Sequence, residues 1–464
     1  MTDDQGYGDL GCHGHPFLKT PNLDKLYAQS TRFTDFHVSP TCAPTRAALM
    51  SGRAPFKVGV THTIWERERM SLNATTIAEV LKEAGYTTGI FGKWHLGDED
   101  EYQPHNRGFD ETFIHGGSGI GMSFPGSQAD APHSRYFDPI IKHNNAFVQT
   151  KGYCTNVFFR QALGWIKGCK GKGKRFFAYI PTNAPHGPWI VADKYKALYK
   201  GECSDRAAAY FGMVANIDEN VGLLMQKLSD WGLADSTLLI FMSDNGGYPF
   251  LPYKCGLKGH KGTNDEGGSK VPLFFRLPGR IEPGVDVDRL ARHYDIFPTL
   301  AEFAGVPIPK DLDLDGRSLV TLIDNPQAEW ADRYTFFHIG RWGKKGGGMS
   351  HKPEHKITDP DKAKYKDFAV RNEKWRYVGV WSRTRDLPAA LYDIDNDPGE
   401  EKNVIEQHPE VAQKMLKAYD AWWEEVRPLM VNEDAPLNTP KPFHIRFEKQ
   451  KKTTGIPDWN APQF

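Results

Sequence analysis

One cysteine, Cys42, stands in a segment whose residue types are suited to chemistry. The segment runs Ser39-Pro-Thr-Cys-Ala-Pro-Thr-Arg46 and is followed by Ala47 to Met50, which are good helix formers. Because Pro44 suits a first helical turn, we expect a short helix that begins near Cys42 and ends near Gly52. The N–H groups at such a helix start favour an anion. From the residues alone, Cys42 is either a low-pKa nucleophile or a buried structural cysteine.

Side chains with oxygen ligands occur in two other places. Asp3 and Asp4 are adjacent and precede a glycine-rich turn, and the glycines permit an irregular backbone that aims both carboxylates at one point. Asp244 and Asn245 directly follow an apolar segment that is predicted to be a strand. Carboxylate and amide oxygens are the ligands that hard cations prefer. We therefore expect these four residues to share one cation, rather than to lie in solvated acidic loops.

Lysine and histidine side chains follow two further predicted strands. Lys93 and His95 come directly after the strand at 86–91, so both can line one side of a pocket. His186 follows the strand at 175–180, in a turn whose prolines cannot continue the ladder. Taken singly, such residues are more often solvated or structural than catalytic.

The expected elements alternate between buried strands and helices, and polar residues follow the strand ends. This layout is typical of an α/β sheet whose site lies at the carboxyl ends of its strands. We predict the α/β class: a large sandwich with a mostly parallel central sheet flanked by helices. The expected strands are 86–91, 175–180, 237–242 and 271–275, and the expected helices are 73–84, 152–167, 204–231 and 295–305.

The character of the chain changes near residue 330. Short aromatic stretches predict a small antiparallel sheet at 333–338, 368–371 and 375–381, and residues 409–426 predict a helix. We therefore expect a large α/β domain at 1–330, a C-terminal α+β subdomain at 331–430 and an extended polar tail at 431–464.

The composition excludes several classes of protein. The 464 residues are 39% hydrophobic and 25% charged, as in ordinary soluble globular proteins. The formal net charge is zero, so no global field recruits nucleic acid or an anionic membrane, and no apolar run is long enough to span a membrane. Six scattered cysteines without a CxxC pair argue against a disulfide scaffold and structural zinc, although one or two disulfides remain compatible with them.

The segment around Cys42 resembles the signature of the type I sulfatases, which is Cys-x-Pro-x-Arg followed by an apolar run and Gly-Arg. Other motifs of that family occur in the same order. They are the acidic pair at 3–4, Gly-Lys-Trp-His at 92–95, Ala-Pro-His at 184–186, Ser-Asp-Asn-Gly at 243–246 and Lys-Gly-Thr at 261–263. The last motif carries His260 where the family has a small residue. The resemblance covers roughly residues 3–402 and implies a member of the alkaline phosphatase superfamily.

The resemblance implies an arylsulfatase-like hydrolase of sulfate monoesters, acting on a sulfated carbohydrate or on an aryl or alkyl sulfate. A formylglycine-generating enzyme would oxidise Cys42 to 3-oxoalanine (formylglycine), and a hydroxyl of its hydrate would attack sulfur. One divalent cation, expected to be Ca²⁺, would be bound by Asp3, Asp4, residue 42, Asp244 and Asn245.

The remaining roles also follow from the resemblance. Arg46 would polarise the attacking group, and Lys93, His186 and Lys261 would hold the sulfate. His186 or Lys261 would protonate the leaving alcohol, and His95 would deprotonate the second hydroxyl of residue 42. An apolar strand precedes the acidic pair in the family. Because this sequence opens with Met1-Thr2 at that point, we expect a truncated first strand.

Several questions stay open at this stage. A phosphate or phosphonate ester hydrolase of the same superfamily and a catalytically inactive binding homologue are the rival functions. Lys258 reaches either the sulfate or solvent. Trp65, His115, Trp342 and the basic loop at 343–356 form either the rim of a sugar site or ordinary packing and a solvated loop. The compartment is periplasmic or extracellular if an export signal precedes this sequence, and cytoplasmic otherwise.

Overall fold

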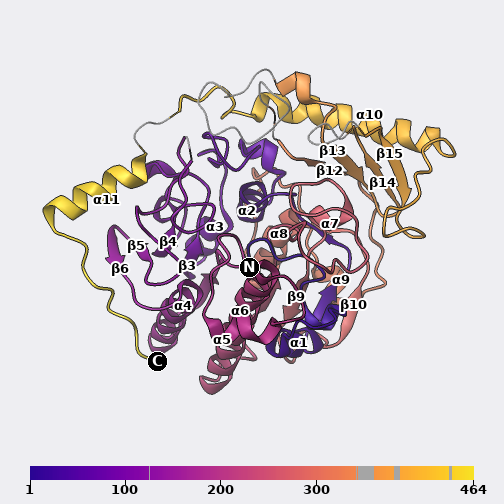
Figure 1. The fold of residues 1–464 in the computed structure, drawn as a ribbon. Helices are drawn as coiled ribbons and strands as arrows, with labels where there is room; N and C mark the ends of the chain where they lie inside the picture. Colours follow the sequence, from indigo (N-terminus) through magenta and orange to yellow (C-terminus); the bar gives the residue numbers. More distant parts are fainter. Residues whose placement is uncertain (125, 341, 343–359, 381–386, 438–440) are drawn as a thin grey trace.

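The computed structural model describes residues 1–124, 126–340, 342, 360–380, 387–437 and 441–464. The larger part has the expected α/β class, with strands between two groups of helices (Figure 1). The smaller part is a separate four-stranded sheet covered by one long helix. The predicted basic loop at 343–356 and Trp381 lie outside the described residues.

Two main sheets carry the larger part, with strand orders β6-β5-β4-β3-β7 and β10-β1-β9-β8. Strand pairing is mixed rather than mostly parallel: β3 pairs in parallel with β4 and β7, whereas β8 and β9 are antiparallel because no long crossover helix joins them. A short parallel pair, β2 (Phe36–His37) with β11 (Ala291–Arg292), adds to them. The main strands are β1 (Thr31–Phe33), β3 (Thr87–Lys93), β4 (Glu111–His115), β5 (Ile140–His143), β6 (Ala146–Gln149), β7 (Phe176–Tyr179), β8 (Leu239–Met242), β9 (Leu273–Arg276) and β10 (Val285–Val287).

Alternate side chains of the strands enter two hydrophobic cores on opposite faces. Ile90 enters one core and Phe91 the other, and the same alternation holds for Phe274 and Phe275. Strands buried on both faces are continuously apolar, which is the pattern that predicted them. One core packs under α2 (Cys42–Ser51), α3 (Ile77–Glu83) and α8 (Ile296–Phe303), and the other under α1 (Pro21–Ala28), α4 (Cys154–Gly171) and α6 (Asp205–Asp230).

Local signals in the sequence explain where the helices begin and end. Helix α2 begins at Cys42 as predicted, and it ends before Gly52, which adopts a φ of 66°. The prediction that Asn73 starts the next helix is wrong. Helix α3 begins after Thr76, because the side chains of Thr76 and Glu79 form a reciprocal capping box.

Met1 and Thr2 lie between the two main sheets. The Thr2 N–H donates to the Met242 carbonyl, and the Thr182 N–H donates to the Met1 carbonyl, each at 2.9 Å. The backbone then turns at Asp4, whose φ is 69°. This is the irregular turn that the glycine-rich sequence predicts. The truncation of the first strand stays a prediction.

The C-terminal sheet has the antiparallel order β12-β13-β14-β15. Its strands are β12 (Thr335–His338), β13 (Phe368–Arg371), β14 (Trp375–Val378) and β15 (Ala390–Asp393). Helix α10 (Pro409–Val426) covers this sheet with Met415, Tyr419 and Trp423, which form one apolar stripe. The sheet and its helix match the prediction.

The prediction of an extended C-terminal tail is wrong. Residues Pro442–Thr453 form helix α11, and Phe443 and Phe447, one turn apart, pack against Phe147 at the edge of the first sheet. Beyond the helix, Gln149 exchanges backbone hydrogen bonds with Pro457 and Trp459. The segment therefore covers the exposed edge of β6.

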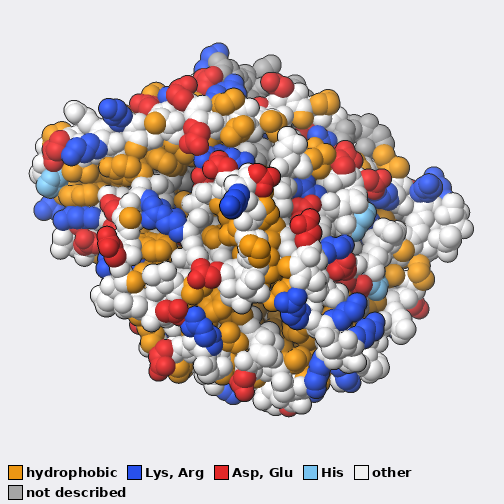
Figure 2. Space-filling view, turned by 180° about the vertical axis from the view of Figure 1, so that it is seen from behind, with side chains coloured by type: hydrophobic (Ala, Val, Ile, Leu, Met, Phe, Trp, Pro, Cys, Tyr) orange, Lys and Arg blue, Asp and Glu red, His pale blue; other side chains and the backbone are white. Residues whose placement is uncertain are grey.

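The surface carries both signs of charge. Figure 2 shows lysine, arginine and acidic side chains interspersed over one face, in keeping with the net charge of zero. All six cysteines are free. Among the described residues, no helix is long and apolar enough to cross a membrane.

Candidate active site

All ten predicted site residues meet at one edge of the larger part. Lys93 ends β3, Asp244 and Asn245 follow β8, and His186 lies in the turn after β7. Helix α2 supplies Cys42 and Arg46 from its first turns. Segments far apart in sequence therefore converge because the carboxyl ends of neighbouring strands share this edge.

Oxygen ligands surround Cys42. Ligand atoms of Asp3, Cys42 and Asp244 lie within 4.8 Å of one another. Asn245 joins this group by donating its Nδ2 hydrogen to Asp4 Oδ1 at 2.7 Å. All four polar ligands have no solvent exposure.

The donor set fits a hard divalent cation. Asp3 Oδ1 and Asn245 Oδ1 are buried and have no hydrogen-bond partner among the described residues. Buried polar atoms without a partner are costly, and a cation that accepts both lone pairs removes this cost. Three carboxylates and an amide oxygen are also the ligand types that Ca²⁺ and Mg²⁺ prefer.

Three cations balance these carboxylates. Arg46 Nη2 lies 2.7 Å from Asp244 Oδ2, Lys93 Nζ lies 2.6 Å from Asp3 Oδ2, and Lys261 Nζ lies 2.6 Å from Asp4 Oδ1. Arg46 and Lys93 are fully buried. Such charge-assisted pairs fix the cations beside the cysteine, where they also face any anionic ligand.

His95 is positioned as a base toward residue 42. Its Nε2 lies 3.0 Å from the Thr63 carbonyl, which only accepts hydrogen bonds, so the proton sits on Nε2. Its Nδ1, which carries the lone pair, then faces Cys42 Sγ at 3.5 Å. Burial and the nearby Lys93 lower the pKa of His95 well below its usual value, so the ring is neutral.

Lys261 and His186 line the open side of the site. Their side chains are 14% and 11% exposed, whereas those of Arg46, Lys93 and Asp4 are fully buried. His186 Nε2 lies 3.6 Å from Asp4 Oδ2, the carboxylate that also binds Lys261. These two side chains are therefore closer to solvent than Arg46, Lys93 and Asp4 are.

Burial and mutual charge shift the pKa values of the acidic ligands in opposite directions. Burial raises the pKa of Asp244 to about 6, aided by the Asp3 carboxylate and opposed by Arg46. Burial alone would also raise the pKa of Asp4, but Lys261 and His186 hold it well below its usual range. Asp4 is therefore ionised at neutral pH.

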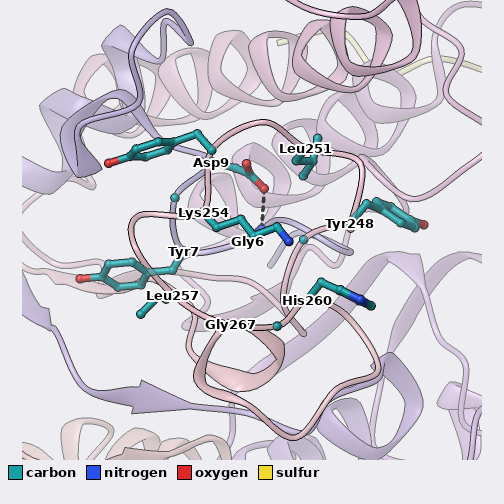
Figure 3. Close-up of a pocket in the computed structure, with 13 residues that line it drawn as sticks. Gly6, Tyr7, Asp9, Tyr248, Leu251, Lys254, Leu257, His260 and Gly267 are labelled. Atoms are coloured by element: carbon teal, nitrogen blue, oxygen red, sulfur yellow. Dashed lines mark hydrogen bonds between the residues drawn. The ribbon is translucent and has the colours of Figure 1, made fainter. Parts of the chain in front are cut away.

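Three residues that shape the site were not predicted. The Tyr248 hydroxyl donates to Asp4 Oδ2, and the Tyr210 hydroxyl lies 2.9 Å from the Asp4 carbonyl and 2.6 Å from Asp9 Oδ2. Asp9 also accepts from the Gly6 N–H at 2.8 Å, across the turn beside a surface pocket whose empty volume is about 290 Å³ with open solvent included (Figure 3). Tyr248 stands three residues after Asn245, which is a usable signal, whereas Tyr210 lies inside an apolar helix pattern and gives none.

Other candidates lie away from the site or within the packing. The Nζ of Lys258 donates to the Tyr392 hydroxyl at 2.7 Å, so this side chain contacts the C-terminal sheet and does not face solvent only. Trp65, His115 and Trp342 are at most 5% exposed, so they are packed inside the protein rather than at a rim. Trp342 donates to Glu433 and stacks under Arg67.

A second group of ligand types is an ion-pair network. Ligand atoms of Asp35, His37 and Glu266 also lie within 4.8 Å of one another. Arg371 and Arg376 already pair with these carboxylates, at 3.1 Å to Asp35 and 2.6 Å to Glu266. These two fixed guanidinium groups repel a further cation, so the cluster is not suited to a metal ion. Because the arginines lie on β13 and β14, their ion pairs join the C-terminal sheet to the larger part.

The fold and the first cluster define a hydrolase site for an anionic ester. The family model described as "Sulfatase" matches residues 1–306, and the model described as "N-sulphoglucosamine sulphohydrolase, C-terminal" matches residues 261–421. The chain therefore belongs to the sulfatase family, whose members hydrolyse sulfuric esters, and the predicted class of enzyme is confirmed.

Known proteins resemble the chain over most of its length. Arylsulfatase A of Homo sapiens is 32% identical over 445 residues, which cover 87% of this chain and 82% of the relative. N-acetylgalactosamine-6-sulfatase of Canis lupus familiaris is 31% identical over 368 residues, 73% of this chain and 67% of the relative. The crystal structure of Ps i-CgsB in complex with k-i-k-neocarrahexaose has a TM-score of 0.77 at 29% identity and covers 91% of both chains.

Proposed function

We propose that the sulfate ester hydrolysed by this sulfatase is carried by a carbohydrate. Two of the similar proteins support this substrate class: one is named for N-acetylgalactosamine 6-sulfate, and another was crystallised with neocarrahexaose. The observation that carries the proposal is the open side of the site. Lys261 and His186 line it, and a cation beside a polar ring suits a sulfate that projects from a larger polar molecule.

We also propose the resident groups. Asp3, Asp4, Asp244 and Asn245 hold one Ca²⁺, which polarises sulfate oxygens when bound. A formylglycine-generating enzyme oxidises Cys42, and the resulting group supplies a hydroxyl nucleophile. The two orphaned oxygens of Asp3 and Asn245 support the metal assignment.

The chain's own residues then have separate tasks. Lys93 and Lys261 neutralise the sulfate oxygens, and Arg46 holds Asp244 in place from the protein interior. His95 accepts a proton at Nδ1 from residue 42, because its Nε2 hydrogen is fixed on the Thr63 carbonyl. His186 and Lys261 stand where the alcohol leaves, and this pair supplies its proton.

The test compares sulfated oligosaccharides with an aryl sulfate, using protein that was co-expressed with a formylglycine-generating enzyme. Ion chromatography measures released sulfate. We expect a higher kcat/KM for at least one sulfated oligosaccharide, and no release by the Cys42→Ala control. Turnover of the aryl sulfate alone contradicts the carbohydrate proposal, and turnover by Cys42→Ala contradicts the role of residue 42.

A further inference from the structure

The end of helix α4 carries a cluster of positive charge that the active site does not use. Residues 139–192 contain eight lysines and arginines and no acidic residue, although the net charge of the whole chain is zero. Five of the eight lie close together, at the end of α4 and in the turn before β7. We call these five residues the basic helix end: Lys167, Lys170, Lys172, Lys174 and Arg175.

The basic helix end is exposed and is not balanced by acidic side chains. All five of its residues are exposed, and its four lysine side chains form no ion pair or hydrogen bond with any described residue. Two carboxylates act on the neighbouring Cys169, and both already bind other side chains. Asp110 pairs with Lys82 at 2.7 Å, and Glu111 binds His143 at 2.7 Å. The positive charge of this surface therefore stays available to a ligand.

A tight turn holds these side chains in one place. The N–H groups of Lys172 and Lys174 both donate to the Cys169 carbonyl, at 3.1 and 3.0 Å. Arg175 fixes the far side of the turn, because its Nη2 donates to the Ala84 carbonyl at 2.7 Å. The lysines therefore project from an ordered backbone that connects α4 to β7.

Stabilisation of the helix accounts for only part of this charge. Cations near the end of a helix interact favourably with its dipole, whose C-terminal end is equivalent to about half an elementary negative charge. The five positive charges of the basic helix end are about ten times larger. Like charges so close in sequence also repel one another. A ligand with several negative charges removes this repulsion.

Glycines leave the surface between the lysines open. Gly168, Gly171 and Gly173 alternate with the lysines, and a Cβ atom at any of the three would meet no atom of the described residues within 4 Å. Gly168 and Gly171 belong to α4, where glycine is less favourable than alanine. No neighbouring side chain requires a glycine there. Without a Cβ atom at these positions, a bulky ligand can lie close to the backbone between the lysines.

We propose that the basic helix end is a second, non-catalytic binding site for a sulfated polysaccharide chain. This inference rests on the proposed function, in which the sulfate ester is carried by a carbohydrate. Such a polymer repeats its sulfate groups along the chain, and each lysine places a point charge on a flexible stem that reaches one of them. Residues 167–175 contain no exposed apolar or aromatic side chain. Membrane-surface helices and sites for single-stranded nucleic acid use such side chains in addition to charge.

The basic helix end lies at the opposite edge of the sheet from the active site. Arg175 directly precedes β7, which pairs in parallel with β3, and Lys93 at the other end of β3 belongs to the active site. A polysaccharide bound to the basic helix end therefore leaves the active site open. It also raises the local concentration of sulfate esters around the enzyme.

The test measures binding of dextran sulfate to the full-length protein with Cys42→Ala, which excludes turnover during the measurement. The test variant carries four further substitutions that keep a helix-forming residue at each position: Lys167→Gln, Lys170→Gln, Lys172→Gln and Lys174→Gln. The control variant loses the same charge from exposed lysines of α10 and α11: Lys414→Gln, Lys417→Gln, Lys449→Gln and Lys452→Gln. We expect Kd to rise by about tenfold or more in the test variant and by less than about twofold in the control.

Two further probes test the class of the ligand. We expect the parent protein to bind dextran sulfate more tightly than duplex DNA and more tightly than vesicles that contain phosphatidylserine. Added NaCl should weaken the binding of dextran sulfate, because salt screens exposed charges. An equal Kd in the test and control variants overturns the proposal. Tighter binding of DNA or of the vesicles through the same four lysines overturns it as well.

Acetylation of lysines gives a readout that does not depend on the folding of the test variant. Mass spectrometry measures how fast each lysine is acetylated with and without dextran sulfate. We expect slower acetylation of Lys167, Lys170, Lys172 and Lys174 in the complex, and little change at Lys414 and Lys417. Equal protection of both groups contradicts the proposal. Failure of the active enzyme to release sulfate from any oligosaccharide refutes the proposed function instead, because the binding measurements do not require turnover.

Discussion

Replacement of Arg376 by glutamine tests how the C-terminal sheet supports the segment around Lys261, which we propose is part of the catalytic site. Arg376, on β14, is fully buried and donates to the Asn264 carbonyl at 2.6 and 2.9 Å, to Glu266 at 2.6 Å and to Ser269 at 3.1 Å. The same segment begins with Lys261, and the next N–H, that of Gly262, donates to the Pro40 carbonyl at 2.8 Å. One arginine therefore holds a segment that includes Lys261, which we propose binds sulfate, and that contacts the segment before Cys42.

The expected cost of Arg376→Gln is about 3–5 kcal/mol, because removal of one partner leaves a buried carboxylate undercompensated. Glu266 keeps Arg371 at 3.2 Å, which favours the lower end of that range. Arg280→Gln is the matched control. Arg280 pairs with Asp324, and both side chains are about half exposed. Loss of this pair in Arg280→Gln should therefore lower the free energy of unfolding by at most about 1 kcal/mol.

Urea unfolding followed by tryptophan fluorescence measures the stability of both variants. Steady-state kinetics on the folded proteins show whether the position of Lys261 has changed. We expect a clear fall of the unfolding midpoint for Arg376→Gln only, and a lower kcat with a smaller change of KM. The double variant Arg376→Gln/Glu266→Gln should recover part of the lost stability, because it removes the undercompensated carboxylate while Arg371 keeps its pair with Asp35. Equal midpoints for Arg376→Gln and Arg280→Gln would refute the reasoning.

Three further predictions concern the site and its surroundings. Lys261→Ala should lower kcat by about 10²–10³-fold, because it removes a cation that we propose binds sulfate. Lys258→Ala should change kcat little, because the Lys258 side chain binds Tyr392. Similar losses of kcat in both variants would contradict this assignment. Burial raises the pKa of Asp130 to about 7. Between about pH 4 and 7 the Asp130 carboxyl is therefore protonated in the folded protein and ionised in the unfolded chain. The free energy of unfolding falls as pH rises through that window. Asp130→Asn should therefore gain thermal midpoint relative to wild type from pH 5 to pH 8, and a difference that is constant with pH would contradict the cause. Chelation with EGTA should abolish sulfatase activity, and added Ca²⁺ should restore it. Full activity in excess EGTA would contradict the proposal that the enzyme needs a bound Ca²⁺.

The sequence predicted best those features that depend on local patterns. The helix at Cys42 has good helix formers between Pro44 and Gly52, and the helix Pro409–Val426 has an apolar period and begins with a proline, so their bounds were predictable. The residues of the first cluster were predictable because each belongs to a short motif that resembles the sulfatases, either after a strand or at the start of α2. The start of α3 was predicted wrongly because Asn73 is also a capping residue type, and the reciprocal pair of Thr76 and Glu79 decided the boundary.

Features that depend on distant contacts were not predictable in the same way. Helix α11 lies in a polar, basic stretch, and only its contact with Phe147 shows why Phe443 and Phe447 order it. The mixed strand pairing likewise depends on which edges meet in space. Tyr210 stabilises the turn of Asp4 from the middle of a long helix, where its neighbours in sequence give no sign of that role.

We propose that residue 42 is an oxidised cysteine at the centre of the sulfatase site. Mass spectrometry of the tryptic peptide Phe33 to Arg46 tests it most directly, using protein co-expressed with a formylglycine-generating enzyme. The account predicts an aldehyde at residue 42 that a hydrazine reagent traps as a hydrazone. An unmodified Cys42 thiol, in a preparation where a control sulfatase is converted, would contradict it.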